Sequence, residues 1–161
     1  WWGAEIGIET GSPRLIEAAM PAKAGPFKPE EWPDVVKTAA GTMTDNDFVA
    51  ACTLIVGLNE ETEDDIIKTI ELVDDLKDFK SVIVPLFFVP MGKLKNQNWF
   101  EYEELSSMHK ELLSVCVRHD LYWTKKIFGS YFEGQWRGPI FSVLFKFLVW
   151  YVNYKARKVL R

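Results

Sequence analysis

Apolar and polar residues alternate in two periods along the first 92 positions of the chain. Short apolar runs at 4–10, 48–56 and 81–89 are each followed by a loop that contains Gly or Pro. Their length and β-branched content are typical of strands, although Pro85 inside the third run disfavours regular pairing there. The segments between the runs carry apolar residues at helical spacing. The pattern predicts three strands separated by helices.

The segment between the first two strands carries signals for two helices. Ser12 suits an N-cap and Pro13 a first helical position, so a short helix is expected to run to about Met20. A second helix is expected to open at Pro29 and to end at Gly41. Its inner face is expected to carry Val35, Val36 and Ala39.

A third helix is expected between the second and third strands. Thr62 followed by Asp65 resembles a capping box, and apolar residues at helical spacing continue to about Asp78. Strands that alternate with helices indicate parallel βαβ units with right-handed crossovers. Three strands cannot close a barrel, so the fold is expected to be part of a (β/α) barrel or an open α/β sheet.

The chain changes character after the third strand. A helical stripe runs from Glu101 to about Lys126, and a link rich in Gly and aromatic residues covers 128–138. Residues 139–154 are almost all apolar, and the tail 155–161 carries only basic charges. We therefore expect two parts, a barrel-like domain and a helical, aromatic extension, at residues 1–98 and 99–161.

The apolar helix with the basic end has two interpretations. It is either a helix that docks on the barrel or on a partner, or an interfacial helix whose Lys and Arg meet anionic lipid. A membrane span is disfavoured because about 20 apolar residues are needed and Lys146 interrupts the run. A peripheral membrane contact through 139–161 therefore stays open beside docking.

Composition narrows the class of protein. The chain is 48% hydrophobic and 26% charged, with a net charge of −4, which gives no reason to expect nucleic-acid binding. Cys52 and Cys116 lie in a strand pattern and a helix pattern, so both are expected to be packed thiols in a reducing, cytoplasmic compartment. The start at Trp1, without Met, suggests a piece of a longer protein.

The carboxyl ends of the three predicted strands carry the candidate chemistry. In a parallel sheet they meet on one edge, where ligands bind. Their carboxylates, hydroxyls and glycine backbone suit ribose hydroxyls and an ammonium group. No glycine-rich phosphate loop or nucleophilic serine elbow is present. His109 and His119 are too far apart in sequence for a zinc motif. His109 is expected at the surface, and His119 is expected either in packing or at a helix end.

Each of these residues also has a purely structural explanation. Ser12 is adequately explained as a helix cap, and Glu9 as a surface acid at a strand end. The acids from Glu60 to Asp65 are explained as first-turn residues that the helix dipole stabilises. Only their joint pattern favours a site.

The joint pattern resembles a known family. Ile6-Gly-Ile-Glu-Thr-Gly-Ser12, Thr53-Leu-Ile-Val-Gly-Leu-Asn-Glu-Glu-Thr62 and Pro85-Leu-Phe-Phe-Val-Pro-Met-Gly92 are similar to the second half of a radical S-adenosylmethionine (SAM) enzyme core. More narrowly, the pattern is similar to the group whose members often carry an upstream cobalamin-binding domain. The resemblance implies a partial (β/α)6 barrel, in which these strands are the fourth, fifth and sixth.

The resemblance also implies a set of SAM-binding residues. Ribose contacts would lie at the end of the fourth strand, the adenine would pack near the fifth-strand loop and the sixth-strand end, and a lysine would meet the SAM carboxylate. The residues that match these positions are Glu9, Thr10, Ser12, Lys23, Thr53, Ile55, Gly57, Glu60, Glu61, Val89, Pro90 and Met91.

The sequence departs from the family pattern at three points. Thr53 stands where the pattern prefers Gly, and Asn59-Glu60 replaces Pro-Gly. The Cys-x3-Cys-x2-Cys motif that binds the 4Fe-4S cluster is absent from this chain and belongs near the family's first strand. The missing N-terminal half of the same protein would supply it, so this chain alone is expected to be inactive.

In the whole protein the resemblance implies reductive cleavage of SAM by the cluster. The product would be a 5′-deoxyadenosyl radical, or a SAM-derived methyl group would pass through cobalamin. The small-molecule substrate is not encoded in these motifs.

Two other functions remain open at the level of sequence. One is a non-catalytic interaction or membrane-surface module that acts through 139–161, and the other is an acid/base enzyme that uses Glu9 and Glu61. For the leading interpretation we expect the chain to fold poorly or to self-associate on its own, because a sheet edge would be left unpaired.

Overall fold

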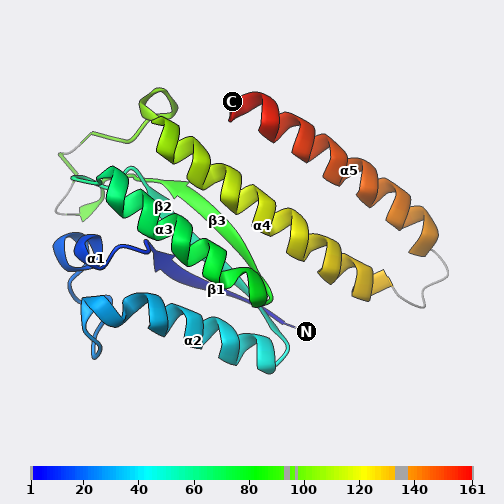
Figure 1. Ribbon diagram of the computed structural model, residues 1–161, viewed down its shortest axis with the longest axis horizontal. Helices are drawn as coiled ribbons and strands as arrows, with labels where there is room; N and C mark the ends of the chain where they lie inside the picture. The colour runs from blue at the N-terminus through cyan, green and yellow to red at the C-terminus, as the bar shows by residue number, and fades with distance from the viewer. Residues whose placement is uncertain (1, 93–94, 97, 133–137, 161) are drawn as a thin grey trace.

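The computed structural model describes residues 2–92, 95–96, 98–132 and 138–160 (Figure 1). Three parallel strands form one sheet in the order β1-β2-β3. In register, Ile6 lies opposite Cys52, which lies opposite Ile83. The strands are β1 (Trp2–Glu9), β2 (Phe48–Val56) and β3 (Ser81–Phe87).

Helices separate the strands and complete two βαβ units. Both units have the parallel geometry that the alternating pattern predicted, so the α/β class and the parallel sheet are confirmed. The helices are α1 (Pro13–Ala19), α2 (Trp32–Asp45), α3 (Glu63–Asp75), α4 (Ser107–Phe132) and α5 (Gly138–Val159). Short 3₁₀ turns are η1 (Pro29–Glu31), η2 (Leu76–Asp78) and η4 (Tyr102–Glu104).

One face of the sheet carries the hydrophobic core. In Figure 1, α3 lies in front of the sheet, α2 runs below it in the view, and α4 runs beside α3. Alternate residues of β2 (Ala50, Cys52, Leu54 and Val56) are fully buried beneath these helices. Leu112 and Cys116 of α4 belong to the same buried cluster, so α4 packs on the α/β core rather than standing apart from it.

The opposite face of the sheet is much less covered by the described residues. Its amino-terminal end is closed where Val49 packs with Trp123 and Ile127 of α4. Towards the carboxyl end, Leu86 remains 48% exposed, and Thr53 is only half-buried. An apolar sheet face left open in this way is free to pack against further structure or to line a site.

The outer edge of β3 is protected. The Ile83 backbone N–H at this edge donates to Asp120 Oδ1 over 2.7 Å. Pro85 has no N–H to expose, and it pairs in register with Leu54. Contrary to the prediction, Pro85 does not disturb the pairing, because β3 is an edge strand. Its proline also blocks the addition of a further strand at this edge.

The structure of α2, the second helix between β1 and β2, corrects two predictions. α2 does not end at Gly41 but continues to Asp45. Ala39 is exposed, and Ala40 is buried in its place. Residues four apart lie on one helical face, so the face that begins at Val36 continues at Ala40.

Strand bounds also differ from the prediction at both ends of the sheet. β1 begins at Trp2 rather than Ala4 and ends at Glu9, where the backbone turns into a left-handed conformation. β3 ends at Phe87 rather than Val89. The following Phe88 N–H still bonds to Val56, and the chain then leaves the sheet.

The C-terminal part is more helical than predicted. α4 begins at Ser107, after η4, and continues to Phe132, so the start of the predicted link at 128–138 is helix. Residues 133–137 of that link lie outside the described residues. α5 runs to Val159 and includes most of the basic tail. No helix in the described part of the chain has the length and apolarity needed to cross a bilayer.

Candidate functional site at the carboxyl ends of the strands

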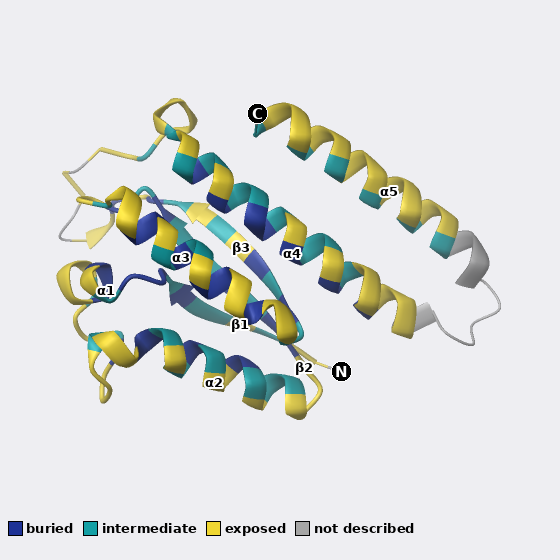
Figure 2. Cartoon of the chain, viewed as in Figure 1, coloured by how far each residue is buried: buried dark blue, intermediate teal, exposed yellow. Residues whose placement is uncertain are grey.

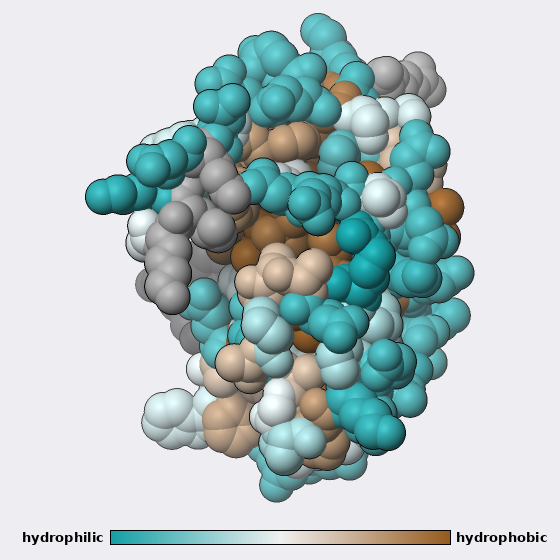
Figure 3. All heavy atoms as spheres, turned by 90° about the vertical axis from the view of Figure 1, so that its left-hand side faces the viewer, coloured by the Kyte–Doolittle hydropathy of each residue, from teal (hydrophilic) through white to brown (hydrophobic). Residues whose placement is uncertain are grey.

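The loops that follow β1, β2 and β3 form one rim. Figure 3 views this side of the molecule, where hydrophobic surface lies between hydrophilic borders. Four rim residues have left-handed backbone: Glu9 (φ 60°), Gly57 (φ 80°), Glu60 (φ 63°) and Gly92 (φ 58°). Such a backbone is uncommon for glutamate, and strained residues of this kind cluster at functional sites.

Asp65 joins the first loop to the second. This carboxylate is 1% exposed and accepts hydrogen bonds from Ser12 Oγ (2.5 Å) and from the Thr62 backbone N–H (2.8 Å). It also forms an ion pair with Arg14 of α1. Burial alone would raise the pKa of Asp65, but the hydrogen bonds from Arg14, Ser12 and Thr62 outweigh it and hold the pKa well below 3.8.

Ser12 and Thr62 are helix caps as well as partners of Asp65. The Ser12 side chain accepts the Leu15 N–H at the start of α1, which confirms the predicted cap. Thr62 and Asp65 form the predicted capping box of α3. Because the Ser12 hydroxyl is buried and bonded within the protein, its predicted contact with ribose would require it to leave Asp65.

Thr10 is also buried within the rim. Its Oγ1 lies 3.0 Å from Thr69 Oγ1, and Thr69 donates its own proton to the Asp65 carbonyl over 2.9 Å. Thr10 must therefore donate to Thr69, and Thr10 Oγ1 in turn accepts a hydrogen bond from the Ser12 N–H. This chain of bonds fixes the turn after β1 against α3.

Glu61 forms a second buried cluster, with His109 of α4. The Ser106 N–H donates to His109 Nδ1 over 3.1 Å, so the neutral ring carries its proton on Nε2. Nε2 then donates to Glu61 Oε2 over 2.9 Å, and the Gly57 N–H donates to the same oxygen over 2.8 Å. Burial raises the pKa of Glu61, and the bonds from His109 and Gly57 only partly oppose it.

Phe100 closes this cluster from the side of the third loop. Its ring centroid lies 5.1 Å from that of His109. A Cβ built on Gly57 would come within 2.0 Å of the Phe100 ring, so both the left-handed backbone and the close packing require glycine there. The expected surface position of His109 is wrong: the residue is 9% exposed, because it pairs with Glu61.

Glu9 and Lys23 form an ion pair on the less covered face of the sheet. Lys23 Nζ lies 2.8 Å from Glu9 Oε1, and both side chains remain partly exposed. A Cβ on Gly7 would meet both groups, at 2.2 Å from Glu9 Oε1 and 2.9 Å from Lys23 Nζ. The pair therefore lies directly over Gly7, beside Thr53 in the register of β1 and β2.

The remaining predicted residues surround this face and the rim. Ile55 is half-buried and packs with the Leu15, Leu58 and Phe88 cluster. Val89 and Met91 are exposed, Met91 by 74%, and Pro90 is buried. The Glu60 side chain is exposed, and its backbone carbonyl accepts a hydrogen bond from Arg14 over 2.6 Å.

The predicted residues thus separate into three groups. Glu9, Lys23 and Thr53 share one face, Glu61 and Gly57 belong to the His109 cluster, and the others form the rim or cap helices. Arg14 and His109 were missed as members of these clusters. The helical position of His109 gave no signal for its contact with a residue 48 positions away.

Neither cysteine fits an iron–sulfur cluster or a metal. Cys52 and Cys116 are free and fully buried, which confirms them as packed thiols, and burial raises the pKa of each thiol to about 12. Among the described residues, no group of three His, Cys, Asp or Glu side chains is placed to hold a metal ion.

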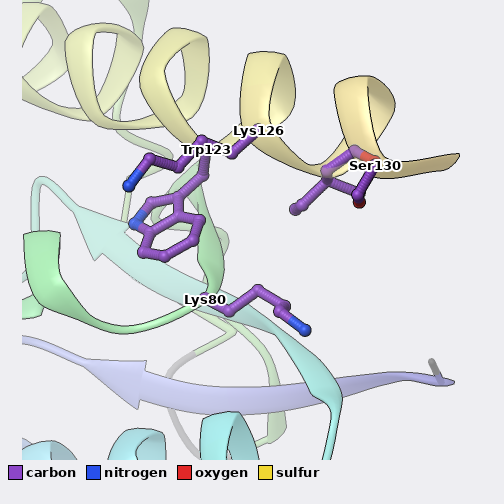
Figure 4. Close-up of a pocket in the computed structure, with 5 residues that line it drawn as sticks. Lys80, Trp123, Lys126 and Ser130 are labelled. Atoms are coloured by element: carbon purple, nitrogen blue, oxygen red, sulfur yellow. The ribbon is translucent and has the colours of Figure 1, made fainter. Parts of the chain in front are cut away.

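Two hollows lie away from the rim. A cavity of about 70 Å³ at the start of β3 is lined by Lys80, Trp123, Lys126, Ile127 and Ser130 (Figure 4). A groove of about 420 Å³ between α3 and α4 includes the buried His119, which bonds to Ser81 Oγ over 2.9 Å and confirms its predicted packing. The small cavity has room for a water or a small ion but not for a nucleoside.

Comparison of the chain with protein-family models, curated proteins and solved structures found no match.

Proposed function

We propose that this chain is the C-terminal half of the barrel of a radical SAM enzyme and contributes the nucleoside-binding side. In this proposal, β1, β2 and β3 are the fourth, fifth and sixth strands of a partial (β/α)6 barrel. The less covered face of the sheet would be the barrel interior. Further strands, supplied by the N-terminal half of the protein, would pair with β1.

One observation carries the proposal most directly. The Glu9–Lys23 ion pair lies at the carboxyl end of β1, over Gly7, on the face that the helices do not cover. It offers a carboxylate acceptor for hydroxyl or ammonium groups and an ammonium donor for a carboxylate. SAM carries all three of these groups on one molecule, so the pair suits it.

The second loop supports the proposal in a different way. Gly57, Glu61 and His109 hold the loop after β2 in one conformation without using any group on the open face. The side chains of Thr53 and Ile55 stay half-buried: Thr53 Oγ1 donates to the Ile6 carbonyl over 3.5 Å, and Ile55 packs on the cluster described above. A preformed loop of this kind binds a ligand without paying for its own ordering.

The residues present do not supply redox chemistry. In the proposed whole protein, a 4Fe-4S cluster bound elsewhere would supply the electron that cleaves SAM, and cobalamin would be a further cofactor where its domain is present. The groups of this chain would bind and orient the nucleoside and the amino-acid part of SAM. Glu61 faces His109 rather than the open face, which makes it a loop-positioning residue in this proposal.

The proposal is tested first on the gene. The complete reading frame should encode a Cys-x3-Cys-x2-Cys motif upstream of Trp1, and the purified full-length product should bind iron and sulfide at about four of each per chain after reconstitution. A complete frame without that motif overturns the proposal.

The nucleoside site is tested by binding of S-adenosylhomocysteine to the full-length protein. Glu9→Gln and Lys23→Ala should each weaken binding about tenfold, as expected for loss of a charged hydrogen bond. Glu17→Gln and Lys28→Ala are the matched controls, because both side chains are exposed on the outside of the molecule. Equal affinities for all four variants would remove these two residues from the site.

A further inference from the structure

α5 turns its most apolar side away from the protein. The positions that face α4 recur every three or four residues and are half-buried at Ser142, Phe145, Val149, Asn153 and Ala156. The Phe145 ring stacks on Phe128 of α4, with centroids 4.6 Å apart. Figure 2 shows that exposed residues predominate along the rest of the helix.

The outward side is apolar and aromatic. Its side chains are between 45% and 67% exposed, and they are Val143, Leu144, Phe147, Trp150, Tyr151 and Tyr154. A helix on the surface of a globular protein normally buries its apolar stripe and exposes its polar one. α5 departs from this: the side towards α4 mixes apolar residues such as Phe145 with Ser142 and Asn153, while large apolar side chains remain exposed on the other side. A continuous apolar face of this size marks an interaction surface.

Every charged residue of α5 is basic. The helix contains Lys146, Lys155, Arg157 and Lys158 and no acid, although the chain as a whole has a net charge of −4. All four side chains are exposed. The surface that α5 contacts is therefore expected to be negatively charged.

The aromatic residues specify the kind of surface. Trp150 and Tyr154 stack with ring centroids 5.8 Å apart on the exposed side, close to the basic end of the helix. Trp and Tyr concentrate where a bilayer meets water, because one part of each ring system is apolar and another is polar. Lys and Arg next to them reach lipid phosphates with their charged ends while their stems remain in apolar surroundings.

We propose that α5 is an interfacial helix that docks the protein on an anionic membrane surface. The helix lies in the plane of the membrane, with the side that carries Phe147 and Tyr151 at the boundary of headgroups and acyl chains. Its 22 residues would cover about 33 Å of membrane surface. The convex outward side suits a bilayer, which needs no complementary groove. This inference does not depend on the proposed SAM site.

The test is flotation of the full chain with two kinds of vesicle, one of phosphatidylcholine alone and one that also contains about 30% phosphatidylglycerol, an anionic lipid. The chain should float with the anionic vesicles at low salt, about tenfold less with the neutral ones, and about tenfold less again in about 0.5 M salt. Failure to float with anionic vesicles at low salt overturns the proposal, as does equal binding to both compositions.

Matched variants locate the contact. Phe147→Ser with Trp150→Ser, and separately Lys155→Glu with Lys158→Glu, should each reduce flotation about tenfold or more. The controls are Trp99→Ser and Lys28→Glu with Lys77→Glu, which change exposed residues outside α5 and should bind as the wild-type chain does. Unchanged binding by the α5 variants, with wild-type circular dichroism and melting temperature, overturns the assignment of α5.

A second copy of the chain is the alternative occupant of this surface. Sedimentation velocity without vesicles measures it directly. One outcome is that the chain self-associates, that Phe147→Ser with Trp150→Ser abolishes this association, and that the chain binds no vesicles. This outcome would show that α5 is a protein interface and would overturn the membrane proposal. A monomer whose tryptophan emission shifts to the blue only with anionic vesicles, and in which Trp150→Phe removes most of that shift, supports it.

Discussion

Asp65 and Glu61 are carboxylates of α3 and of the loop that precedes it. Both side chains are almost inaccessible to water, but their pKa values shift in opposite directions. Asp65 is 1% exposed and the Glu61 side chain 5% exposed. The pKa of Asp65 is lowered, whereas the pKa of Glu61 is raised. Burial raises both pKa values, and the hydrogen-bond partners of Asp65 outweigh burial whereas those of Glu61 do not.

The partners differ in charge and in number. Asp65 has the permanent positive charge of Arg14 and donors on Ser12 and Thr62, which together more than offset burial. Glu61 has one backbone N–H and an imidazole, which donates one hydrogen bond and carries a charge only when protonated. A buried carboxylate therefore stays ionised only where several donors, including a cation, converge on it.

The largest effect is expected from removing Asp65. Asp65→Ala leaves the donors of Ser12 and Thr62 without a partner and removes the capping box of α3, so the free energy of unfolding should fall by about 2–4 kcal/mol. Chemical denaturation measures this. Asp64→Ala is the control, because Asp64 is exposed in the same helical turn and should change stability by less than about 0.5 kcal/mol. Equal losses for both variants would contradict the role of Asp65.

Gly57 tests the packing of the Glu61 cluster. Gly57→Ala should lower the free energy of unfolding by about 2–3 kcal/mol, because the new Cβ meets Phe100 and the backbone is left-handed. Gly92→Ala is a matched control: Gly92 also has positive φ (58°), but a Cβ there meets nothing within 4 Å. It should lose only about 1 kcal/mol. Thermal melts of both variants measure the difference, and equal losses would show that Phe100 does not constrain Gly57.

Asp120 extends the comparison to a carboxyl with a single donor. Burial raises its pKa to about 7, and the Ile83 N–H only partly opposes this. A raised pKa means that the contribution of Asp120 to stability is fully present below about pH 4 and is lost as the pH rises through 7. The stability of wild type relative to Asp120→Asn, which cannot ionise, should fall by about 1–3 kcal/mol between pH 4 and 8.

Asp65 should show the opposite dependence in the same experiment. Its lowered pKa makes its contribution present above about pH 4 and lost as the pH falls below its ordinary value of 3.8. Urea denaturation of wild type, Asp120→Asn and Asp65→Asn from about pH 2 to about pH 8 measures both slopes, that of Asp65 below pH 4 and that of Asp120 above it. Slopes of the same sign would mean that the partners do not set the two pKa values.

Local patterns in the sequence were enough to predict much of the fold. The structure confirms the predicted β2 strand at 48–56 and the predicted caps at Ser12 and Thr62, because each depends on neighbouring residues. It also confirms the parallel α/β order that the alternation of strand and helix patterns predicted. The prediction that α2 ends at Gly41 was wrong, because glycine inside a helix is tolerated where the helix is held by packing. The prediction that Ala39 lies on the inner face of α2 was also wrong. The barrel, the SAM site and the radical chemistry stay predictions.

The sequence by itself determined which residues stand at the three strand ends, since the strands, caps and turns are local features with their own periods. Only the tertiary structure decided their partners. The pairing of Arg14 with Asp65, of His109 with Glu61 and of Lys23 with Glu9 depends on how α1, α3 and α4 pack on the sheet. The outward direction of the apolar side of α5 was likewise decided by its packing on α4, because the sequence of a helix does not specify which side meets its neighbour.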